Sequence, residues 1–224
     1  MTAELIVPDW SVRAGVHGLV TTRALGDMAS ADGRAKLRAF LPAEPAWLRQ
    51  VHGATVVDAA CAPGGTIADA SFATRKNVVC AVRVADCMPV FLAAEEGGAV
   101  AIAHAGWRGL CAGVIEATVA ALRVPPGSLQ AWLGPAIGPG AYEVGEAVRA
   151  AFLQRDARTE SAFTPARPGH WHLDLYAVAR HRLANLGVTK VLGGGYCTAS
   201  DSNLFYSYRK DKTTERMAAV IWLA

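Results

Sequence analysis

The stretch VADCMPVFLAAEEGGAVAIAHAGWRGLCAG, residues 84–113, places polar and reactive side chains at the ends of two apolar runs. The two runs are short and continuous, and the tight turn EEGG separates them, so they are predicted to form a buried antiparallel hairpin. Asp86 and Cys87 come directly before the first run, and His104 lies near the end of the second. Core packing requires none of these residues there. We therefore expect them to belong to a functional site.

The rest of the chain predicts a mixed α/β fold. Apolar and alternating segments indicate strands at 16–22, 47–57, 78–84, 88–94, 99–105, 129–133, 188–192 and 217–223. Helices are expected at 108–123, where apolar residues recur at helical spacing, and near 143–153 and 174–186. The chain contains no obvious linker, repeat or low-complexity tract. Its 224 residues are therefore expected to form one domain, 1–224.

Composition narrows the class of protein. The formal net charge is only +3 and the basic residues are scattered, apart from RKDK at 209–212, so nucleic acid is not an expected partner. No secretory signal is seen at the N-terminus, and no apolar run approaches the roughly 20 residues that span a bilayer. The five cysteines include no C-x-x-C pair. A reduced, cytoplasmic protein is the prediction.

His52, Cys87 and His104 are candidate ligands of a catalytic metal site. Their spacing is too wide for a structural zinc site with paired ligands, but a catalytic zinc site needs only three protein ligands and one open position. One cysteine and two histidines suit Zn²⁺ or, with different geometry, copper. A metal-free alternative makes Cys87 a nucleophile with His104 or His52 as its base. A further alternative is that all three residues are ordinary core or surface residues.

Several residues near these motifs are candidates for proton transfer or substrate contacts. Asp86 is a candidate general base, or a partner that orients a histidine. Arg23, Arg108 and Arg209 are candidate contacts for phosphate oxygens, because a guanidinium binds phosphate bidentately. Gln50, in the QVHG motif, is grouped with them as a substrate contact.

Three other motifs have simpler interpretations. GPAIGPG at 134–140 has no Lys, Ser or Thr of a P-loop, so a strand-to-helix turn is preferred over a phosphate cradle. HWH at 170–172 is interpreted as part of a loop or an edge strand. FYSY at 205–208 alternates, so Phe205 and Ser207 are expected on one side and the two tyrosines on the other. Its aromatic rings are suited to stacking on a flat base or to core packing.

The motifs QVHGATV, DA at 69–70, ADCMPV, HAGWRG, GPAIGPGAYEVG, YCT and FYSYR occur in this order, and the sequence resembles the YfiH family over nearly its whole length. This family is also known as laccase-domain or multicopper polyphenol oxidase proteins. The resemblance implies a single layered α/β domain of mixed sheets with helices packed on them. It also implies a zinc site formed by His52, Cys87 and His104.

The resemblance further implies a purine nucleoside phosphorylase that acts on adenosine, inosine, guanosine and methylthioadenosine, with adenosine deaminase activity. Asp86, Cys87 and His104 would then be catalytic. The expected partners are a nucleoside and phosphate, without nucleic acid or membrane, and the chain would be a monomer or a homodimer.

Two other activities remain open. A Cys–His amidase would account for a role in peptidoglycan editing. A copper polyphenol oxidase would need several copper centres, for which six histidines are few. The sequence also departs from the family pattern, because the segment 24–46 is shortened, Val84 replaces a threonine, and Glu215 replaces a glycine.

Overall fold

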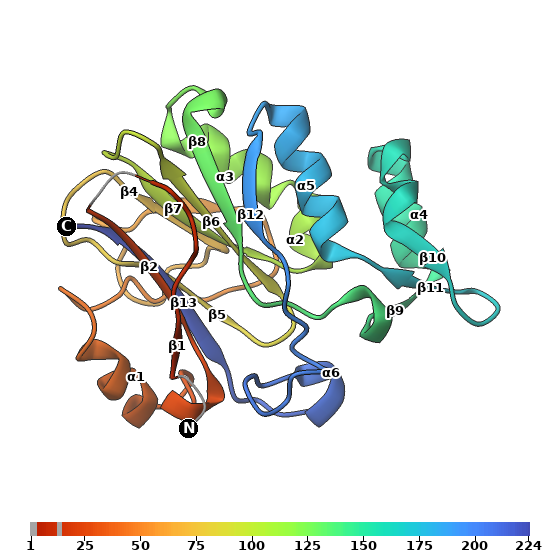
Figure 1. The fold of residues 1–224 in the computed structure, drawn as a ribbon, viewed down its shortest axis with the longest axis horizontal. Coiled ribbons are helices and arrows are strands. Elements are labelled where there is room, and N and C mark those ends of the chain that lie inside the picture. The colour runs from red at the N-terminus through yellow and green to blue at the C-terminus, as the bar shows by residue number, and fades with distance from the viewer. Residues whose placement is uncertain (1–3, 13–14) are drawn as a thin grey trace.

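The structure is a computed structural model that describes residues 4–12 and 15–224. Its largest element is a six-stranded sheet with the order β12-β8-β6-β7-β4-β3 (Figure 1). In chain order the strands are β3 (Val56–Asp58), β4 (Ala70–Ala73), β6 (Met88–Ala94), β7 (Val100–Ala105), β8 (Leu129–Leu133) and β12 (Lys190–Gly193). β6 and β7 form the predicted antiparallel hairpin, in which Met88 pairs with Ala105. The hairpin lies at the centre of this sheet.

A four-stranded antiparallel sheet packs against one face of the larger sheet. Its order is β1-β2-β13-β5, formed by β1 (Leu5–Ile6), β2 (Val16–Thr21), β13 (Met217–Leu223) and β5 (Cys80–Val84). Side chains alternate along a strand, so Phe91 and Ile102 of the hairpin point toward this second sheet. There they share one buried cluster with Val82 and Ile221. The contact between the two sheets is therefore apolar.

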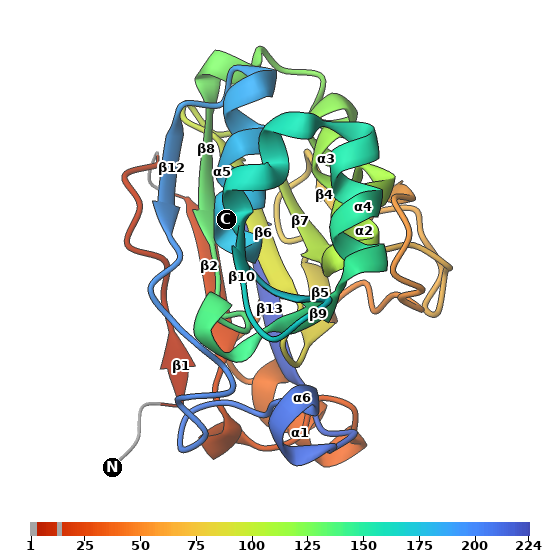
Figure 2. The same cartoon turned by 90° about the vertical axis from the view of Figure 1, so that its right-hand side faces the viewer.

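Helices cover the other face of the six-stranded sheet. They are α2 (Trp107–Ala112), α3 (Val114–Leu122), α4 (Glu146–Arg155) and α5 (Leu175–Leu186), and Figure 2 shows them on one side of the strands. Val90 and Leu92 of β6 join a buried cluster with Ile115 and Leu183 of these helices. A further helix, α1 (Ala31–Arg38), packs Leu37 on the outer face of the four-stranded sheet. The expected layered α/β fold with helices packed on the sheets is confirmed.

A small third sheet lies beyond α5. Its order is β10-β11-β9, formed by β9 (Glu143–Gly145), β10 (Phe163–Pro165) and β11 (His170–Leu173). The HWH motif therefore lies in the middle strand, paired on both sides. Its interpretation as a loop or an edge strand is wrong, because residues 143–145, which were expected to begin a helix, form β9 instead and pair with β11.

The strand predicted at 47–57 is also wrong for most of its length. Only Val56–Asp58 forms a strand. The backbone N–H groups of Val51, His52 and Gly53 instead donate hydrogen bonds to the carboxylate of Asp69. A loop results, because these groups bind one side chain rather than a neighbouring strand.

Two other local predictions need correction. The helix expected at 108–123 is two helices, since Gly113 adopts a left-handed conformation with φ 90° between α2 and α3. In FYSY, Phe205 and Tyr206 are both buried, and Ser207 caps the short helix α6 (Tyr208–Asp211). The expected alternation of sides fails because the chain turns into α6.

No helix in the described part of the chain has both the length and the apolar character needed to cross a membrane. All five cysteines, which lie within the described ranges, are free thiols.

Candidate metal centre and active site

The side chains of His52, Cys87 and His104 meet at one point of the fold. His104 lies on β7, and Cys87 comes directly before β6 on the paired strand. His52 reaches them from the loop 49–53, in which it adopts a left-handed φ of 61°. The candidate ligand atoms all lie within 4.8 Å of one another, and the two imidazole rings are 4.8 Å apart at their centres.

Asp69 fixes the orientation of two of these residues. Its Oδ1 accepts a hydrogen bond from Nδ1 of His104 at 2.9 Å and from the backbone N–H of His52 at 2.8 Å. Burial alone would raise the pKa of this carboxyl, but the bonds from His104, Gly53 and Val51 lower it. Asp69 is fully buried and accepts four hydrogen bonds.

Asp69 was not predicted as a site residue. It lies directly before the short strand β4 and far from the other motifs along the chain. The signal in the sequence was the family motif Asp69-Ala70. An acidic residue beside an apolar strand is seldom buried without a partner, which was the available physical clue.

Cys87 and His104 form a charged pair. Burial alone would raise the pKa of the Cys87 thiol, but the charge of His104 and hydrogen bonds with both histidines lower it to about 6. Burial would lower the pKa of His104, but the charge of Cys87 and the bond to Asp69 raise it to about 9. At neutral pH the arrangement therefore favours a thiolate beside an imidazolium, or a thiolate ready to bind a metal.

The donor set fits a Zn²⁺ ion. Thiolate sulfur and imidazole nitrogen are common zinc ligands, at about 2.0–2.3 Å from the metal. Nδ1 of His104 is engaged by Asp69, so Nε2 is left as its ligand atom, and a carboxylate orients a metal-binding imidazole in this way. Three protein ligands leave a fourth position for substrate. Copper also accepts these donors.

Glycine at position 106 keeps the three donors close together. A Cβ atom there would lie 2.6 Å from Sγ of Cys87 and 3.4 Å from Cδ2 of His52. Gly106 is also the N-cap of α2, with an ordinary φ of −77°. A glycine is therefore required here because a side chain would not fit, and not because of the backbone conformation.

Asp86 binds groups other than the histidines. Its Oδ1 accepts hydrogen bonds from the hydroxyls of Thr198, at 2.6 Å, and Ser207, at 2.7 Å. Its Oδ2 accepts the backbone N–H of Arg209 at 2.6 Å. The expectation that Asp86 orients a histidine is thus corrected, because Asp69 does so. Asp86 instead joins the start of the hairpin to the C-terminal part of the chain.

A cavity of about 730 Å³ opens over the three donors. Its wall is strongly basic. In the described part of the chain, Asp86 is the one acidic residue that lines it. Its arginines are Arg49, Arg83, Arg108, Arg209 and Arg216, and its aromatic residues are Trp107, Tyr142 and Tyr208. The guanidinium carbon of Arg108 lies 4.5 Å from the centre of the Trp107 ring. These features suit an anionic group beside a flat ring system.

Two of the predicted substrate contacts have other roles. Arg23 does not border this cavity, because its guanidinium lies over Tyr206, donates to the Ser202 carbonyl and pairs with Asp211. The Gln50 amide does border it, but it binds both the N–H and the C=O of Arg83 at 2.8 Å. Gln50 therefore connects two segments of backbone. Arg108 and Arg209 lie on the wall, as a phosphate contact requires.

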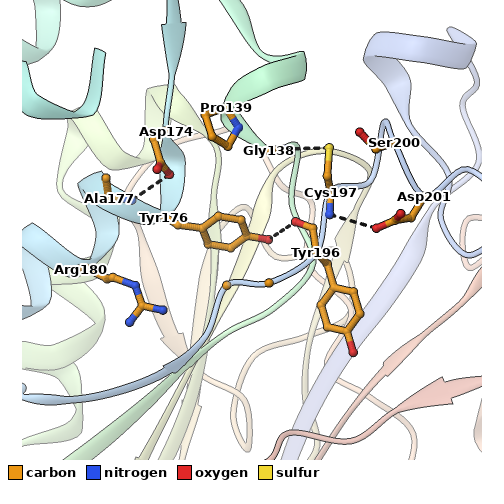
Figure 3. Close-up of a pocket in the computed structure, with 12 residues that line it drawn as sticks. Gly138, Pro139, Asp174, Tyr176, Ala177, Arg180, Tyr196, Cys197, Ser200 and Asp201 are labelled. Carbon is orange, nitrogen blue, oxygen red and sulfur yellow. Dashed lines mark hydrogen bonds between the residues drawn. The ribbon is translucent and has the colours of Figure 1, made fainter. Parts of the chain in front are cut away.

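A second cavity of about 520 Å³ is bordered by residues that include Gly138, Tyr176 and Cys197 (Figure 3). The Cys197 sulfur accepts the Gly138 N–H at 3.2 Å, and the Tyr176 hydroxyl bonds to the carbonyl of Tyr196 at 2.9 Å. The next residue, Thr198, holds Asp86. The segment that borders this second cavity therefore also positions a residue of the first. GPAIGPG forms the loop that leads from β8 (Leu129–Leu133) into the single turn Pro139–Ala141.

The chain is similar to known proteins over nearly its whole length. The model of the family described as multi-copper polyphenol oxidoreductase laccase matches residues 27–224. Purine nucleoside phosphorylase PA4543 of Pseudomonas aeruginosa is 46% identical over 97% of this chain and 98% of that protein. Purine nucleoside phosphorylase YfiH of Escherichia coli is 44% identical over 99% of both chains.

Solved structures are similar as well. The crystal structure of protein NMB0706 from Neisseria meningitidis has a TM-score of 0.91 and 42% identity over 99% of both chains. YlmD from Geobacillus stearothermophilus has a TM-score of 0.80 and 27% identity, covering 94% of this chain and 92% of that one.

Proposed function

This chain belongs to the multi-copper polyphenol oxidoreductase laccase family, and on that premise we propose that it is a zinc-dependent purine nucleoside phosphorylase. The observation that carries the proposal is the cluster of His52, Cys87 and His104 at the base of a basic, partly aromatic cavity. Relatives that are 44–46% identical over nearly the whole chain are named purine nucleoside phosphorylases. The proposed ligands are a nucleoside and inorganic phosphate.

In the proposed reaction, a phosphate oxygen bonds to C1′ of the ribose as the bond between C1′ and the purine nitrogen breaks. The arginines of the cavity wall bind and orient the phosphate dianion, which would otherwise be repelled by the thiolate of Cys87. When bound, Zn²⁺ supplies a Lewis acid that withdraws electron density from an oxygen or nitrogen of the substrate. Asp69 keeps the His104 imidazole oriented throughout.

The proposed substrates are adenosine, inosine, guanosine and methylthioadenosine, and adenosine deamination is proposed at the same centre. Asp86 is the candidate proton carrier for deamination. An ionised carboxylate has about four acceptor positions, and three are filled by Thr198, Ser207 and Arg209. One position on Asp86, which borders the cavity, is thus available for a substrate proton.

The charged pair of Cys87 and His104 supports a second candidate function, a metal-free Cys–His amidase. A thiolate stabilised by an adjacent imidazolium is the nucleophile that such chemistry uses. A copper polyphenol oxidase receives less support. The described residues form a single group of three or more potential metal ligands, whereas that activity needs several copper centres.

The test is a chromatographic assay of inosine and adenosine turnover, with and without phosphate. It uses purified protein of known metal content, the variant Cys87→Ala, and Cys61→Ala as a control at an exposed thiol outside the cavity. Phosphate-dependent release of free base, lost in Cys87→Ala and retained in Cys61→Ala, is the expected result. Inosine formed from adenosine would add the deaminase activity.

A chelator separates the two candidate functions. Removal of the metal should abolish phosphorolysis and leave a Cys–His amidase active. No turnover of any purine nucleoside by the metal-loaded protein would overturn the phosphorylase proposal, and hydrolysis of amide substrates would then be assayed with the same variants.

A further inference from the structure

We propose that Tyr142 is a catalytic residue that donates its hydroxyl proton to the departing purine, a role that rests on the proposed phosphorolysis. Nothing in the family's description or in the names of the relatives assigns a function to this residue. It belongs to the motif GPAIGPGAYEVG, which the metal centre does not otherwise use.

Tyr142 is held firmly in place. It follows the single turn Pro139–Ala141 and directly precedes β9. Its backbone N–H donates to the Pro139 carbonyl at 3.2 Å, and its carbonyl accepts the Leu173 N–H at 3.0 Å. Because both backbone groups are hydrogen-bonded, the backbone of Tyr142 is fixed on the cavity wall.

Arg209 fixes the ring itself. Its guanidinium carbon lies 4.9 Å from the centre of the Tyr142 ring, and its Nη1 donates to the Glu143 carbonyl at 2.7 Å. The backbone N–H of the same arginine binds Asp86. The phenol is therefore oriented by a residue that also belongs to the phosphate-binding wall.

The hydroxyl of Tyr142 is free to bind a ligand. Within the described residues it makes no hydrogen bond, although the side chain is half-buried and borders the cavity over Cys87. Tyr176, by contrast, bonds through its hydroxyl to Ala136, Gly134 and Tyr196. The Tyr142 hydroxyl has no such partners in the described chain, and its side chain lines the cavity, so the hydroxyl can donate to a bound substrate.

The Tyr142 hydroxyl has the chemistry that the step requires. The arginines of the cavity wall donate hydrogen bonds but do not give up protons. A phenol is a neutral donor with a proton that can be transferred, and Tyr142 carries one on the wall of the cavity that contains Cys87.

The step balances in protons and electrons. The electron pair of the broken bond between C1′ and N9 moves onto the purine, where a ring nitrogen takes the proton from the Tyr142 oxygen. A phosphate oxygen forms the new bond to C1′, and the proton of hydrogen phosphate returns to the phenolate through solvent. The products are ribose 1-phosphate and neutral base.

The experiment compares inosine with 7-methylguanosine, whose purine already carries a positive charge and leaves without further protonation. General acid catalysis contributes about 10²–10⁴-fold. Tyr142→Phe in the metal-loaded protein should therefore lower kcat with inosine at least about 100-fold, and with 7-methylguanosine less than about tenfold, with KM for phosphate little changed. Tyr196→Phe, in the second cavity, is the control and should match the wild type.

The outcomes separate the two proposals. Equal losses of kcat with both nucleosides would mean that Tyr142 has only a structural role. Full activity of Tyr142→Phe would mean that the hydroxyl has no role in the reaction. Either result overturns this inference while the phosphorylase proposal stands. A wild-type protein that turns over neither nucleoside would overturn both. Because the hydroxyl makes no hydrogen bond to the described chain, Tyr142→Phe should retain the wild-type melting temperature.

Discussion

Nδ1 of His104 lies 2.9 Å from Oδ1 of Asp69, and the same oxygen accepts the backbone N–H of His52 at 2.8 Å. One buried carboxylate atom thus positions two of the three proposed metal ligands, one through its ring and the other through its backbone. The third ligand, Cys87, is placed by the register of the central hairpin. The site therefore depends on Asp69 as much as on its own donors.

The variant Asp69→Asn should bind zinc about 10–100-fold more weakly, which is the usual cost of removing the partner of a metal-binding histidine. The NH₂ group of the new amide would also face the backbone N–H groups of residues 51–53, which donate to the carboxylate in the wild type. These N–H groups would lose an acceptor, so the loop should become more mobile. Competition with a chromophoric chelator measures the affinity.

A matched control for this variant exists outside the site. Asp156 accepts a hydrogen bond from Nε2 of His181 at 2.8 Å. Asp156→Asn should leave zinc affinity unchanged. Equal affinities for the wild type and Asp69→Asn would show that Asp69 does not orient the ligands.

Gly106→Ala should abolish metal binding and activity while the fold persists. The new Cβ would overlap Sγ of Cys87, and the backbone at this N-cap is ordinary, so the effect is local. Gly145→Ala is the control, because Gly145 caps α4 with nearly the same dihedral angles and nothing lies near its Cβ position. Bound zinc and circular dichroism are measured for both variants. A Gly106→Ala protein with full zinc content would contradict the crowding seen here.

In metal-free protein, the ultraviolet absorbance of the Cys87 thiolate should appear with a midpoint near pH 6, well below the usual thiol pKa of 9.0. The difference spectrum against Cys87→Ala isolates this thiol. In His104→Gln the charge of His104 no longer opposes burial, and only His52 still lowers the pKa of Cys87, so the midpoint should move upward. A Cys87 midpoint that is the same in both proteins would contradict the charged pair.

The same pair makes the stability of the metal-free protein depend on pH. The lowered pKa of Cys87 stabilises the fold at high pH, and this contribution is lost as pH falls through about 6. The raised pKa of His104 stabilises the fold at low pH, and this contribution is lost as pH rises through about 9. In urea unfolding, the stability that Cys87 contributes relative to Cys87→Ala should therefore be lost as pH falls through about 6.

Arg216→Gln should raise KM for phosphate about tenfold to a hundredfold, the expected loss for one hydrogen bond to a charged group. Burial and then the neighbouring charges of Arg34 and Arg216 lower the pKa of Arg83, so these guanidinium groups repel one another until an anion binds. Arg23→Gln is the control, since Arg23 lies outside the cavity. An unchanged KM in Arg216→Gln would remove this arginine from the phosphate site.

The sequence predicted the hairpin and the layers because their signals are local. The buried strands are continuous apolar runs, and EEGG allows only a tight connection. The family motifs also indicated which histidines and which cysteine belong together. In the structure, those three residues lie close together although they come from separate segments of the chain.

Features that depend on distant partners could not be predicted in this way. The loop around His52 resembles a strand in its sequence, but its N–H groups bind Asp69, which lies 16 to 18 residues further along the chain. Arg23 and Arg216 are both plain arginines in sequence, and only the fold places one of them on the cavity wall. Asp86 is held by Thr198 and Ser207, more than 100 residues away.

The position of β13 also governs when the protein can mature during synthesis. This strand pairs with β2 on one side and β5 on the other, yet it leaves the ribosome after both of them. A nascent chain that already displays His52, Cys87 and His104 still lacks the middle of the four-stranded sheet and the hydroxyls that hold Asp86. The proposed metal centre can therefore reach its mature geometry only after β13 has been translated through Leu223.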